Sequence, residues 1–413
     1  MAKYDFNSSR YAHLFGTRPN DRRLLSTVVN SEKIVGTNPS WYLTQGSIDP
    51  VMTPSDINGL ATFTVIEREL KAAPIASLRS PLGDTEAVGA GGLNSYSATI
   101  PDFITHKIVE TAMGREEKER RFASQFGNDE EIMRAWVQDA MSLRTSMDST
   151  MTWMTAQLMS TGKINYVMGK GIFTPVHKAP IPAKNFCKAG AKVWTDPDAA
   201  IITYMSEIED KYRQEWGWYG TMKWQMTKKM FVNVFLKNKE VVEKVNEFRA
   251  LADLVAVTFN TLNIDVFNNA WEQIRVAYGL SPIEIVEEKE INATNAGETI
   301  VNGWADKVVV LRPAGDAVKF MRKQILDETY SKYLNNSVER NFAPFNNGLG
   351  MLVNTTVPNG MYTEWQTVVL FSAVPALVEF TKHVIVDTST ANSYPKRRGC
   401  EIPPLPLHTN IYT

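Results

Sequence analysis

The sequence predicts a mixed α+β protein, and two features carry that prediction. Apolar residues recur at helical spacing through a run that holds no glycine or proline from Glu130 until Gly162. Short alternating or continuously apolar segments, such as 61–66 and 307–311, have the length and composition of strands. Further helical patterns separate these segments. Helices and strands mixed along the chain in this way indicate the α+β class.

Residues 1–50 are expected to form an N-terminal arm. Their apolar residues follow no sustained period of about 2 or 3.6, so the segment has no face of its own to bury. It needs the surface of its own body or of a neighbouring copy, and a frayed terminus is the competing interpretation. The adjacent aromatic residues Trp41 and Tyr42 indicate that at least the distal part of the arm is packed.

Residues 51–112 are expected to form a long hairpin with flanking strands. Residues 61–66 alternate as a strand does, a glycine-rich segment follows at 89–92, and extended character returns at 100–104. The glycine-rich segment is expected to be the tip. A two-stranded hairpin is only marginally stable alone, so we expect this one to lie on another surface.

Residues 113–162 carry the strongest periodic signal and are expected to form one long helix. Apart from the polar Arg144, an apolar stripe repeats at spacings of four and three: Met133, Val137, Ala140, Met147, Met151, Met154 and Leu158. Asn128 or Asp129 suits the N-cap, and Gly162 suits the position after the last turn. At 1.5 Å per residue the helix would be roughly 45 Å long. A core-facing stripe is favoured over a ligand-binding or coiled-coil face.

The second half of the chain is expected to mix short helices and strands. Residues 163–220 begin with strand-like pieces between prolines and continue as a helix from about Ala199 to Trp216, with Asp196 as its cap. Residues 221–354 form the most compact unit. Its helices are expected at 228–236, 240–251 and 266–278. Strands are expected at 282–287, 307–311, 349–353, 367–371 and 382–386. Residues 391–413 are expected to be a proline-rich, extended tail.

Charge and composition exclude several classes of protein. The 413 residues contain 44 Lys and Arg and 45 Asp and Glu, so a formal charge of −1 gives no broad attraction to nucleic acid or anionic lipid. The only two cysteines, Cys187 and Cys400, cannot form a disulfide framework, which favours assembly in a reduced, cytoplasm-like compartment. The first thirty residues lack the apolar stretch of a signal peptide. The longest uncharged apolar run, between Glu364 and Glu379, is interrupted by Pro375 and is too short to span a membrane.

No motif indicates catalysis, so we expect neither an enzyme nor a cofactor. The glycine-rich segment at 89–92 lacks the Lys-Ser/Thr ending of a phosphate-binding loop. The five histidines are dispersed and none has a second His or Cys at ligand spacing, which argues against a metal site. Glu284 and Glu288 share a face of an alternating strand, and a solvated strand face is favoured over an acid/base pair.

The order of the parts points to a building block of a large assembly. An arm, a hairpin and a long helix would each expose apolar surface if one copy stood alone. Candidate contacts between copies are the two aromatic residues of the arm, the arginines near the hairpin tip and a run of mixed charge before the long helix. These residues are Trp41, Tyr42, Arg68, Arg79, Glu116, Glu117, Arg120 and Arg121. A soluble helix surface is the alternative interpretation of the mixed-charge run.

Six short segments occur in an order that resembles a known family. They are Pro74-Ile75-Ala76 with Arg79 and Ser80, Leu158 to Lys163, Trp194 to Asp198, Met226 to Met230 with 241–245, 283–286 with Trp304 to Pro313, and Ser372 to Pro375. This order, from about residue 55 to residue 390, resembles the major capsid proteins of tailed bacteriophages with the Hong Kong ninety-seven type fold. The resemblance is strongest to the lambda-like branch called major capsid protein E.

The resemblance implies a division of the chain into named parts. They are an N-arm at 1–50, an E-loop hairpin with flanking strands at 51–112, a spine helix at 113–162, a peripheral domain at 163–220 and 355–390, an axial domain at 221–354 and a C-terminal tail at 391–413. It further implies that hexamers and pentamers of the chain assemble in the host bacterial cytoplasm into the icosahedral shell of the virion. The shell would enclose double-stranded DNA, contacted without specificity.

The implied partners are other copies, the portal and possible scaffold or decoration proteins, with no membrane. An encapsulin-like compartment with enzyme cargo is the alternative. A decoration or tail protein and a cytosolic enzyme are more distant ones.

Overall fold

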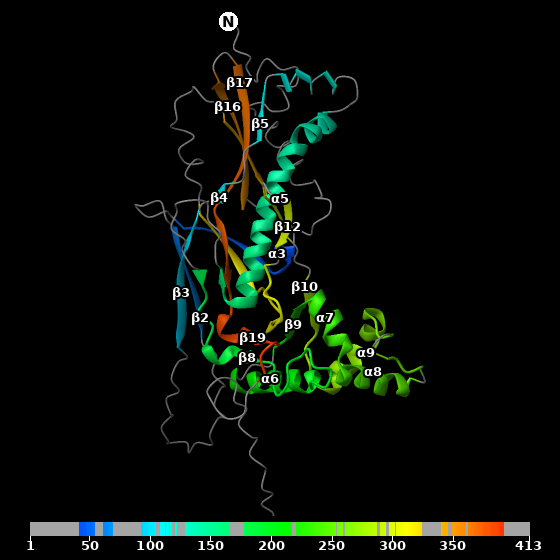
Figure 1. Cartoon of the computed structure of the whole chain (residues 1–413). Coiled ribbons are helices and arrows are strands. Elements are labelled where there is room, and N and C mark those ends of the chain that lie inside the picture. Colours follow the sequence, from blue (N-terminus) through cyan, green and yellow to red (C-terminus); the bar gives the residue numbers. More distant parts are fainter. Residues whose placement is uncertain are drawn as a thin grey trace, which may run out of the picture.

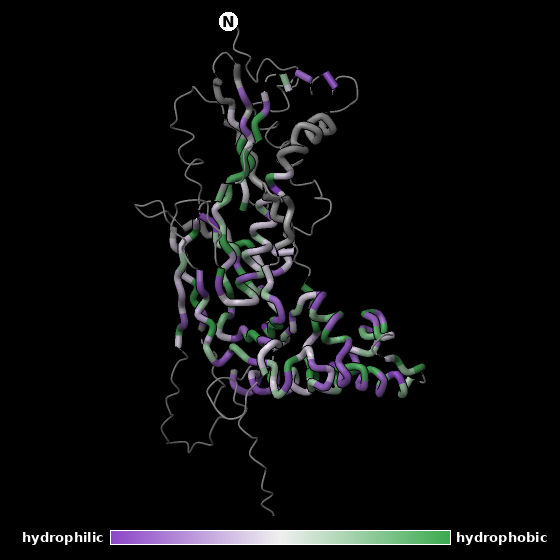
Figure 2. Tube along the Cα trace, in the orientation of Figure 1, coloured by the Kyte–Doolittle hydropathy of each residue, from purple (hydrophilic) through white to green (hydrophobic). Residues whose placement is uncertain are grey.

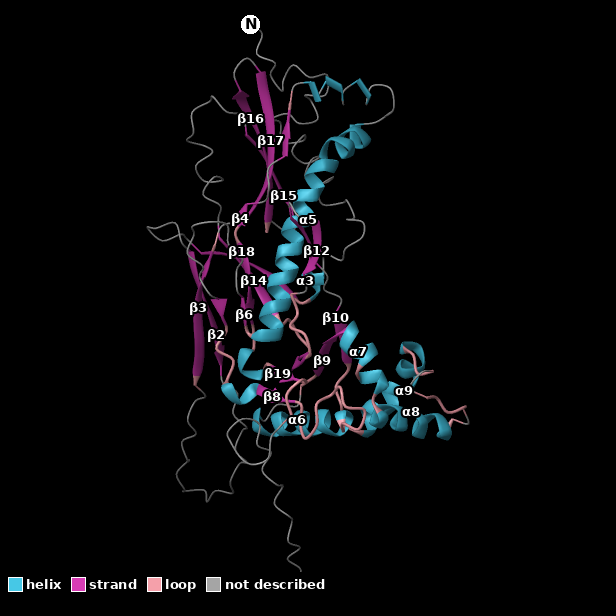
Figure 3. Ribbon diagram, in the orientation of Figure 1, coloured by secondary structure: helices cyan, strands magenta, loops and turns pink. Residues whose placement is uncertain are grey.

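The computed structural model of the chain describes its two cores and the long helix that lies along one of them. The described residues are 41–53, 61–68, 92–101, 103–104, 108–111, 113–114, 116–117, 120–121, 129–164, 177–216, 220–252, 254–258, 261–286, 290–294, 297–301, 303–323, 340–345, 349–359 and 362–391. Most of the predicted arm, the glycine-rich tip with Arg79, and nearly all of the tail lie outside them. Figures 1 and 3 show an elongated body along α5, with the helices α6 to α9 at one end.

The predicted long helix is confirmed as α5, Asp129–Thr161, which has 33 residues. It ends at Gly162, whose φ of 72° is left-handed and whose backbone N–H donates to the Leu158 carbonyl at 2.8 Å. The methionines of the predicted stripe from Met147 onward are completely buried, so this half of the stripe faces the core as expected. Its start at Asp129 agrees with the expected cap at Asn128 or Asp129. The described residues 113–114, 116–117 and 120–121 before it are helical as well.

The first core gathers around α5 and two sheets. One sheet has the order β15 (Arg340–Phe345), β16 (Gly350–Asn359), β17 (Tyr362–Phe371) and β4 (Phe103–Ile104), and β5 (Ile108–Glu110) also pairs with β17. The other has the order β1 (Gly46–Thr53), β14 (Val318–Lys323) and β18 (Ala373–Leu377). Figure 2 shows hydrophobic stretches in the strands beside α5, where this core lies.

The hairpin forms with a different partner from the predicted one. β2, Ala61–Arg68, pairs antiparallel with β3, Leu93–Ile100, from Ala61 opposite Ile100 to Arg68 opposite Leu93. The segment 100–104 was expected to be the second arm, but its residues Phe103 and Ile104 pair with β17 instead. Pro101 cannot donate a ladder hydrogen bond, and Phe103 gains a stacked contact with Phe371, 4.7 Å between ring centroids.

The second core is a five-stranded sheet covered by four helices. The sheet order is β10 (Ile283–Val286), β9 (Met222–Thr227), β13 (Val308–Pro313), β19 (Val384–Asp387) and β8 (Phe186–Lys188). The helices are α6 (Ile201–Trp216), α7 (Lys228–Asn233), α8 (Lys239–Leu251) and α9 (Ile264–Ala277). Thr227, Asn238 and Asn263 cap the last three by accepting backbone N–H bonds, as such side chains do at helix starts.

Helix α6 begins two residues later than predicted because another helix caps it. The carboxylate of Glu240, at the start of α8, accepts the backbone N–H groups of Ile202 at 2.7 Å and Thr203 at 3.1 Å. Asp196, the predicted cap, instead accepts the N–H of Asp198 and closes a turn before the helix. An acidic group at a helix N-terminus is stabilising, so α6 and α8 are joined at their starts.

The two cores do not follow the predicted border at residues 220 and 221. Helix α6, predicted to belong with the peripheral part, packs in the second core with α8 and α9. Strands β14 and β15, predicted to belong to the axial part, lie in the sheets of the first core. The sheet of the second core takes strands from five separate places in the chain, and sequence order cannot show such long-range pairing.

Six further short elements and pairings occur among the described residues. They are α3 (Trp41–Thr44), β6 (Lys163–Ile164) with β7 (His177–Lys178), and β11 (Glu290–Thr294) with β12 (Gly297–Val301). The 3-10 helices are η2 (Ala183–Asn185), η3 (Phe235–Lys237) and η5 (Phe380–Lys382). Among the helices that the structure describes, none is long and apolar enough to cross a membrane.

Candidate assembly surfaces

The last part of the predicted arm is anchored inside its own chain. Trp41 and Tyr42 are buried in the first core, and the Tyr42 hydroxyl donates to the Asp148 carboxylate of α5 at 2.8 Å. β1 then pairs in parallel with β14. At Gly46 a Cβ atom would lie 1.8 Å from the Val318 carbonyl oxygen, so only glycine fits this contact.

This burial corrects one expectation. Trp41 and Tyr42 were predicted as contacts between copies, yet their side chains are covered by α5 and β14 of the same chain. The sequence did indicate correctly that the end of the arm is packed. Because the arm has no apolar face of its own, its aromatic side chains pack on the nearest apolar surface, which here belongs to the same chain.

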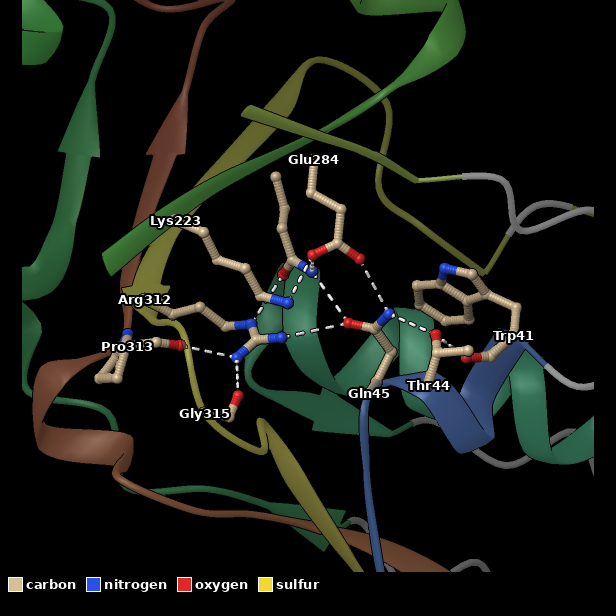
Figure 4. Close-up of polar contacts among 9 residues, drawn as sticks. Trp41, Thr44, Gln45, Lys223, Glu284, Arg312, Pro313 and Gly315 are labelled. Atoms are coloured by element: carbon tan, nitrogen blue, oxygen red, sulfur yellow. Dashed lines mark hydrogen bonds and ion pairs between the residues drawn. The ribbon is translucent and has the colours of Figure 1, made fainter. Parts of the chain in front are cut away.

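A partly buried polar cluster ties this segment to the sheet of the second core (Figure 4). We call it the Gln45 cluster; it contains Gln45, Lys223, Gln225, Glu284 and Arg312. The Gln45 side-chain oxygen accepts from Gln225 Nε2 at 2.9 Å and from Arg312 Nη2 at 3.2 Å. Gln45 Nε2 donates to Glu284 Oε1 at 3.1 Å, and Arg312 Nε donates to Gln225 Oε1 at 2.9 Å. Lys223 Nζ lies 2.5 Å from Glu284 Oε2.

In the Gln45 cluster, the positively charged Arg312 donates to amide and carbonyl oxygens, and Lys223 pairs with the Glu284 carboxylate. Arg312 is 2% exposed, and it also donates to the carbonyls of Pro313 at 2.7 Å and Gly315 at 2.6 Å. Burial lowers the pKa of Arg312 to about 10, and the Glu284 charge opposes that shift, so the guanidinium stays charged at neutral pH. Burial acts to raise the pKa of Glu284, but hydrogen bonds from Lys223 and Gln45 outweigh it and the pKa is lowered.

Glu284 therefore differs from the expected solvated strand face. Its carboxylate is paired with Lys223 and accepts a hydrogen bond from Gln45, so Glu284 helps to hold the end of the arm in place. The sequence had no signal for this cluster, because two of its members are uncharged glutamines far apart in the chain. Glu288, the other predicted member of the pair, lies outside the described residues.

The described strands of the hairpin present one covered face and one open face. Phe63, Val65, Tyr96 and Ile100 are buried against the first core, and the Tyr96 hydroxyl donates to the Leu377 carbonyl at 3.2 Å. Glu67 accepts from the Thr381 hydroxyl at 2.6 Å. On the opposite face Thr64 and Ser97 share a hydroxyl bond at 2.8 Å, and the large apolar side chains of Ile66 and Leu93 are exposed.

Behind the covered face lies a histidine without a hydrogen-bond partner among the described residues. His177 of β7 is buried, and its imidazole meets the rings of Phe63 at 5.6 Å and Tyr96 at 5.9 Å. Burial lowers the pKa of His177 to about 4, so the ring is neutral at physiological pH. Its role here is that of an apolar neighbour of the hairpin.

The far end of the second core carries a cluster of exposed apolar side chains. We call Leu251, Leu254 and Val255 the apolar tip; they are 82%, 53% and 83% exposed. The backbone that carries them is held firmly. Asn246 bonds both the N–H and the carbonyl of Val257 at 2.8 Å, and Arg249 Nε donates to the Val255 carbonyl at 2.8 Å. The sequence signal for this surface is the run of apolar residues that continues after the last turn of α8.

The mixed-charge run forms its ion pairs within the same chain. Glu117 contacts Arg120 and, at 3.0 Å, Arg121, and all three side chains are exposed. Exposed pairs of this kind contribute little to stability. Glu116 lies on the same short helical piece. Arg68 is the last residue of β2 and its side chain is not among those described. Among the described contacts, none joins Glu116, Glu117, Arg120 or Arg121 to Trp41 or Tyr42.

The described residues show no arrangement for metal binding. They also line a cavity, in which the arginine side chain of Arg213 is already paired. No group of three possible metal ligands occurs among the residues that the structure describes. A cavity of about 580 Å³ lies between the start of β9 and the end of α9. Arg213 lines it, but its guanidinium is held by Glu209 at 2.7 Å, and Glu209 also accepts from Trp224 at 3.0 Å.

Comparison with known proteins gives one family. The sequence model of the family described as phage major capsid protein E matches residues 53–305, more than half of the chain. No curated protein matches the chain. Similar solved structures include the capsid of cyanophage A-1(L), 11% identical over 87% of this chain and 96% of that chain, with a TM-score of 0.46. Another is a phage-related protein from Bordetella bronchiseptica RB50, 13% identical over 89% and 96%, with a TM-score of 0.45.

Proposed function

The chain belongs to the phage major capsid protein E family, and from this premise we propose how its copies join. It is the major capsid protein of a tailed phage, which forms the icosahedral shell, is located in the virion and has a structural rather than an enzymatic role. Forming a shell requires self-association. The functional sites are therefore the surfaces that one copy leaves uncovered, and the apolar tip is the observation that carries the proposal.

The apolar tip is proposed as the contact around the axes of hexamers and pentamers. Leucine and valine side chains exposed together on a firmly bonded loop are costly in water, and covering them removes that cost. The tip lies at the end of the second core farthest from α5, where Figure 2 shows a hydrophobic stretch beyond α8. A projecting end brings equivalent residues of several copies together when the copies form a ring.

The position of the apolar tip indicates which core corresponds to which domain of a shell protein. The second core, with α6 to α9, is proposed as the axial domain, and α5 as the spine helix. The sheet of β15, β16 and β17 is proposed as the main part of the peripheral domain. Compared with the division expected from the sequence, helix α6 moves to the axial part, because it shares a core with α8 and α9.

The hairpin is proposed as the E-loop that reaches a neighbouring copy. Its inner face is fastened to its own first core, so the outer face with Ile66 and Leu93 remains for that neighbour. Arg68 and Arg79 are proposed to form ion pairs with the neighbour, and the run from Glu116 to Arg121 is proposed to contribute further charged contacts. Residues 1–40 of the arm are proposed to lie on adjacent copies.

Other partners follow from the role of a phage shell. The portal is proposed as a partner, with scaffold or decoration proteins where the phage encodes them. Double-stranded DNA is proposed as the content, touched without sequence specificity, and a formal charge of −1 fits a wall that releases its genome. The matched family is one of phage capsids, which favours this content over the enzyme cargo of a compartment protein.

The experiment is a charge substitution in the apolar tip with a matched control. Val255→Asp places a carboxylate in the proposed contact and is expected to prevent particles while the chain stays folded by circular dichroism. Val276→Asp makes the same change at a valine that is 74% exposed near the end of α9, away from the tip, and is expected to assemble. Electron microscopy after size-exclusion chromatography reads the result. Normal particles from Val255→Asp would remove the apolar tip from the assembly contacts.

A further inference from the structure

Two helices of the second core carry exposed charges of opposite sign. Helix α7 begins with Lys228 and Lys229, which are both exposed, and it contains no other charged residue. Helix α6 exposes Glu207 and Asp210, which are three residues apart and therefore lie on one face of the helix. We call the first two residues the lysine pair and the other two the acidic pair. Each pair gathers one sign of charge on the surface of a chain whose formal net charge is only −1.

Neither pair is neutralised by an ion pair within the described part of the chain. The other charged residues of α6 are engaged elsewhere. Glu209 pairs with Arg213 at 2.7 Å, and Glu215 pairs with Lys184. Lys211 is half-buried and lies 5.3 Å from the ring centroid of the tyrosine that follows it. Among the ion pairs of the described residues, none includes a member of the lysine pair or of the acidic pair. Both surfaces are therefore open to a partner of opposite charge.

The two pairs lie on opposite sides of the second core. Helix α7 follows β9 directly and packs beside β10, one edge strand of the sheet. The Tyr212 hydroxyl of α6 lies 3.5 Å from the sulfur of Cys187 in β8, the opposite edge strand. Figures 1 and 3 show α6 along the lower side of the second core and α7 above it. Because Ile208 and Tyr212 of α6 are buried against the core, the exposed acidic pair faces outward from its side.

We propose that the lysine pair of one copy contacts the acidic pair of the next copy around a hexamer or pentamer. This rests on the proposed function, in which the apolar tip of each copy points to the axis of the ring. Copies arranged in this way meet side to side, so one side of each copy contacts the opposite side of its neighbour. Opposite charges on the two sides attract at every junction. A copy inserted the wrong way round would bring like charges together, so the pairs also select the orientation.

Charge reversal on one side at a time tests this contact. Lys228→Glu with Lys229→Glu makes both sides acidic, and Glu207→Lys with Asp210→Lys makes both sides basic. Each reversed chain is expected to stay folded by circular dichroism, because the substituted residues are exposed. Its yield of particles is expected to fall more than about tenfold, because like charges then oppose each other at every junction. The matched control carries all four substitutions, which restore opposite charges, and is expected to assemble again.

A mixture of the two reversed chains gives a second, sharper readout. Copies of the two kinds attract each other when they alternate around a ring. A hexamer can alternate throughout, whereas a pentamer must place two copies of the same kind side by side. The mixture is therefore expected to form hexamers without pentamers. Electron microscopy would show them as sheets or open tubes in place of closed shells, under the conditions in which the unchanged chain forms particles.

Three outcomes overturn the proposal. Either reversed chain forming particles at the yield of the unchanged chain would exclude its charges from the contact. A folded chain with all four substitutions that forms no particles would show that the two pairs do not meet. Normal shells that fail only to hold DNA when the lysine pair is reversed would assign that pair to the genome. An unchanged chain that forms no rings contradicts the proposed function and the contact together, so the two failures are distinguishable.

Discussion

Removal of the Gln45 side chain tests how the N-terminal segment is anchored. In Gln45→Ala, Arg312 Nη2 loses its partner in the Gln45 cluster, and Gln225 Nε2 keeps only its bond to Glu284 at 3.2 Å. Glu284 is half-buried and water replaces the lost donor there. A buried bond to a charged group contributes about 2 kcal/mol and a neutral one about 1 kcal/mol, so the segment is expected to lose about 3 kcal/mol of docking free energy.

Hydrogen exchange of the β1 backbone amides measures that loss directly. Because 1.4 kcal/mol corresponds to a factor of ten, protection of β1 is expected to fall about a hundredfold. The matched control is Thr44→Ala, the neighbouring residue, whose exposed hydroxyl bonds Trp41 and Gln45 and is expected to matter by about 0.5 kcal/mol. Equal exchange in the two variants would refute the conclusion that the Gln45 cluster holds the segment.

Two further predictions follow from the same part of the molecule. Gly46→Ala drives a Cβ atom into the Val318 carbonyl and is expected to cost more than about 2 kcal/mol in urea unfolding. Gly315→Ala, where a Cβ atom meets nothing within 4 Å, is the control and is expected to change little. Because the pKa of His177 is lowered from 6.5 to about 4 in the folded chain, its contribution is complete above pH 6.5 and falls by about 1.4 kcal/mol per pH unit below it. His177→Gln is expected to flatten that part of the pH profile of unfolding, and an unchanged slope would contradict the assignment.

The sequence correctly predicted those elements whose formation depends mainly on residues close together in the chain. The long helix α5 and its stop at Gly162 follow from periodicity and from a left-handed residue that glycine adopts easily. The buried strand β13 follows from a continuous apolar run. Pro375 lies within β18, and this is tolerated because β18 is at the edge of its sheet.

Pairing and burial over long distances could not be predicted from the sequence. The choice of β3 as the partner of β2, and of Phe103 for β17, depends on which apolar surfaces meet in space. The Gln45 cluster joins residues 180 and 239 positions apart, with no charge pattern to announce it. The same limit applies to Trp41 and Tyr42. Two adjacent aromatic residues give the same sequence pattern whether they pack on a neighbouring copy or, as here, in the core of their own chain.

Electron microscopy of the purified chain after size-exclusion chromatography tests whether this protein builds a closed shell. Icosahedral particles or hexamer sheets are expected from the chain alone or with the scaffold of its phage. A chain that stays monomeric or dimeric at every salt concentration, with that scaffold present, would contradict that expectation.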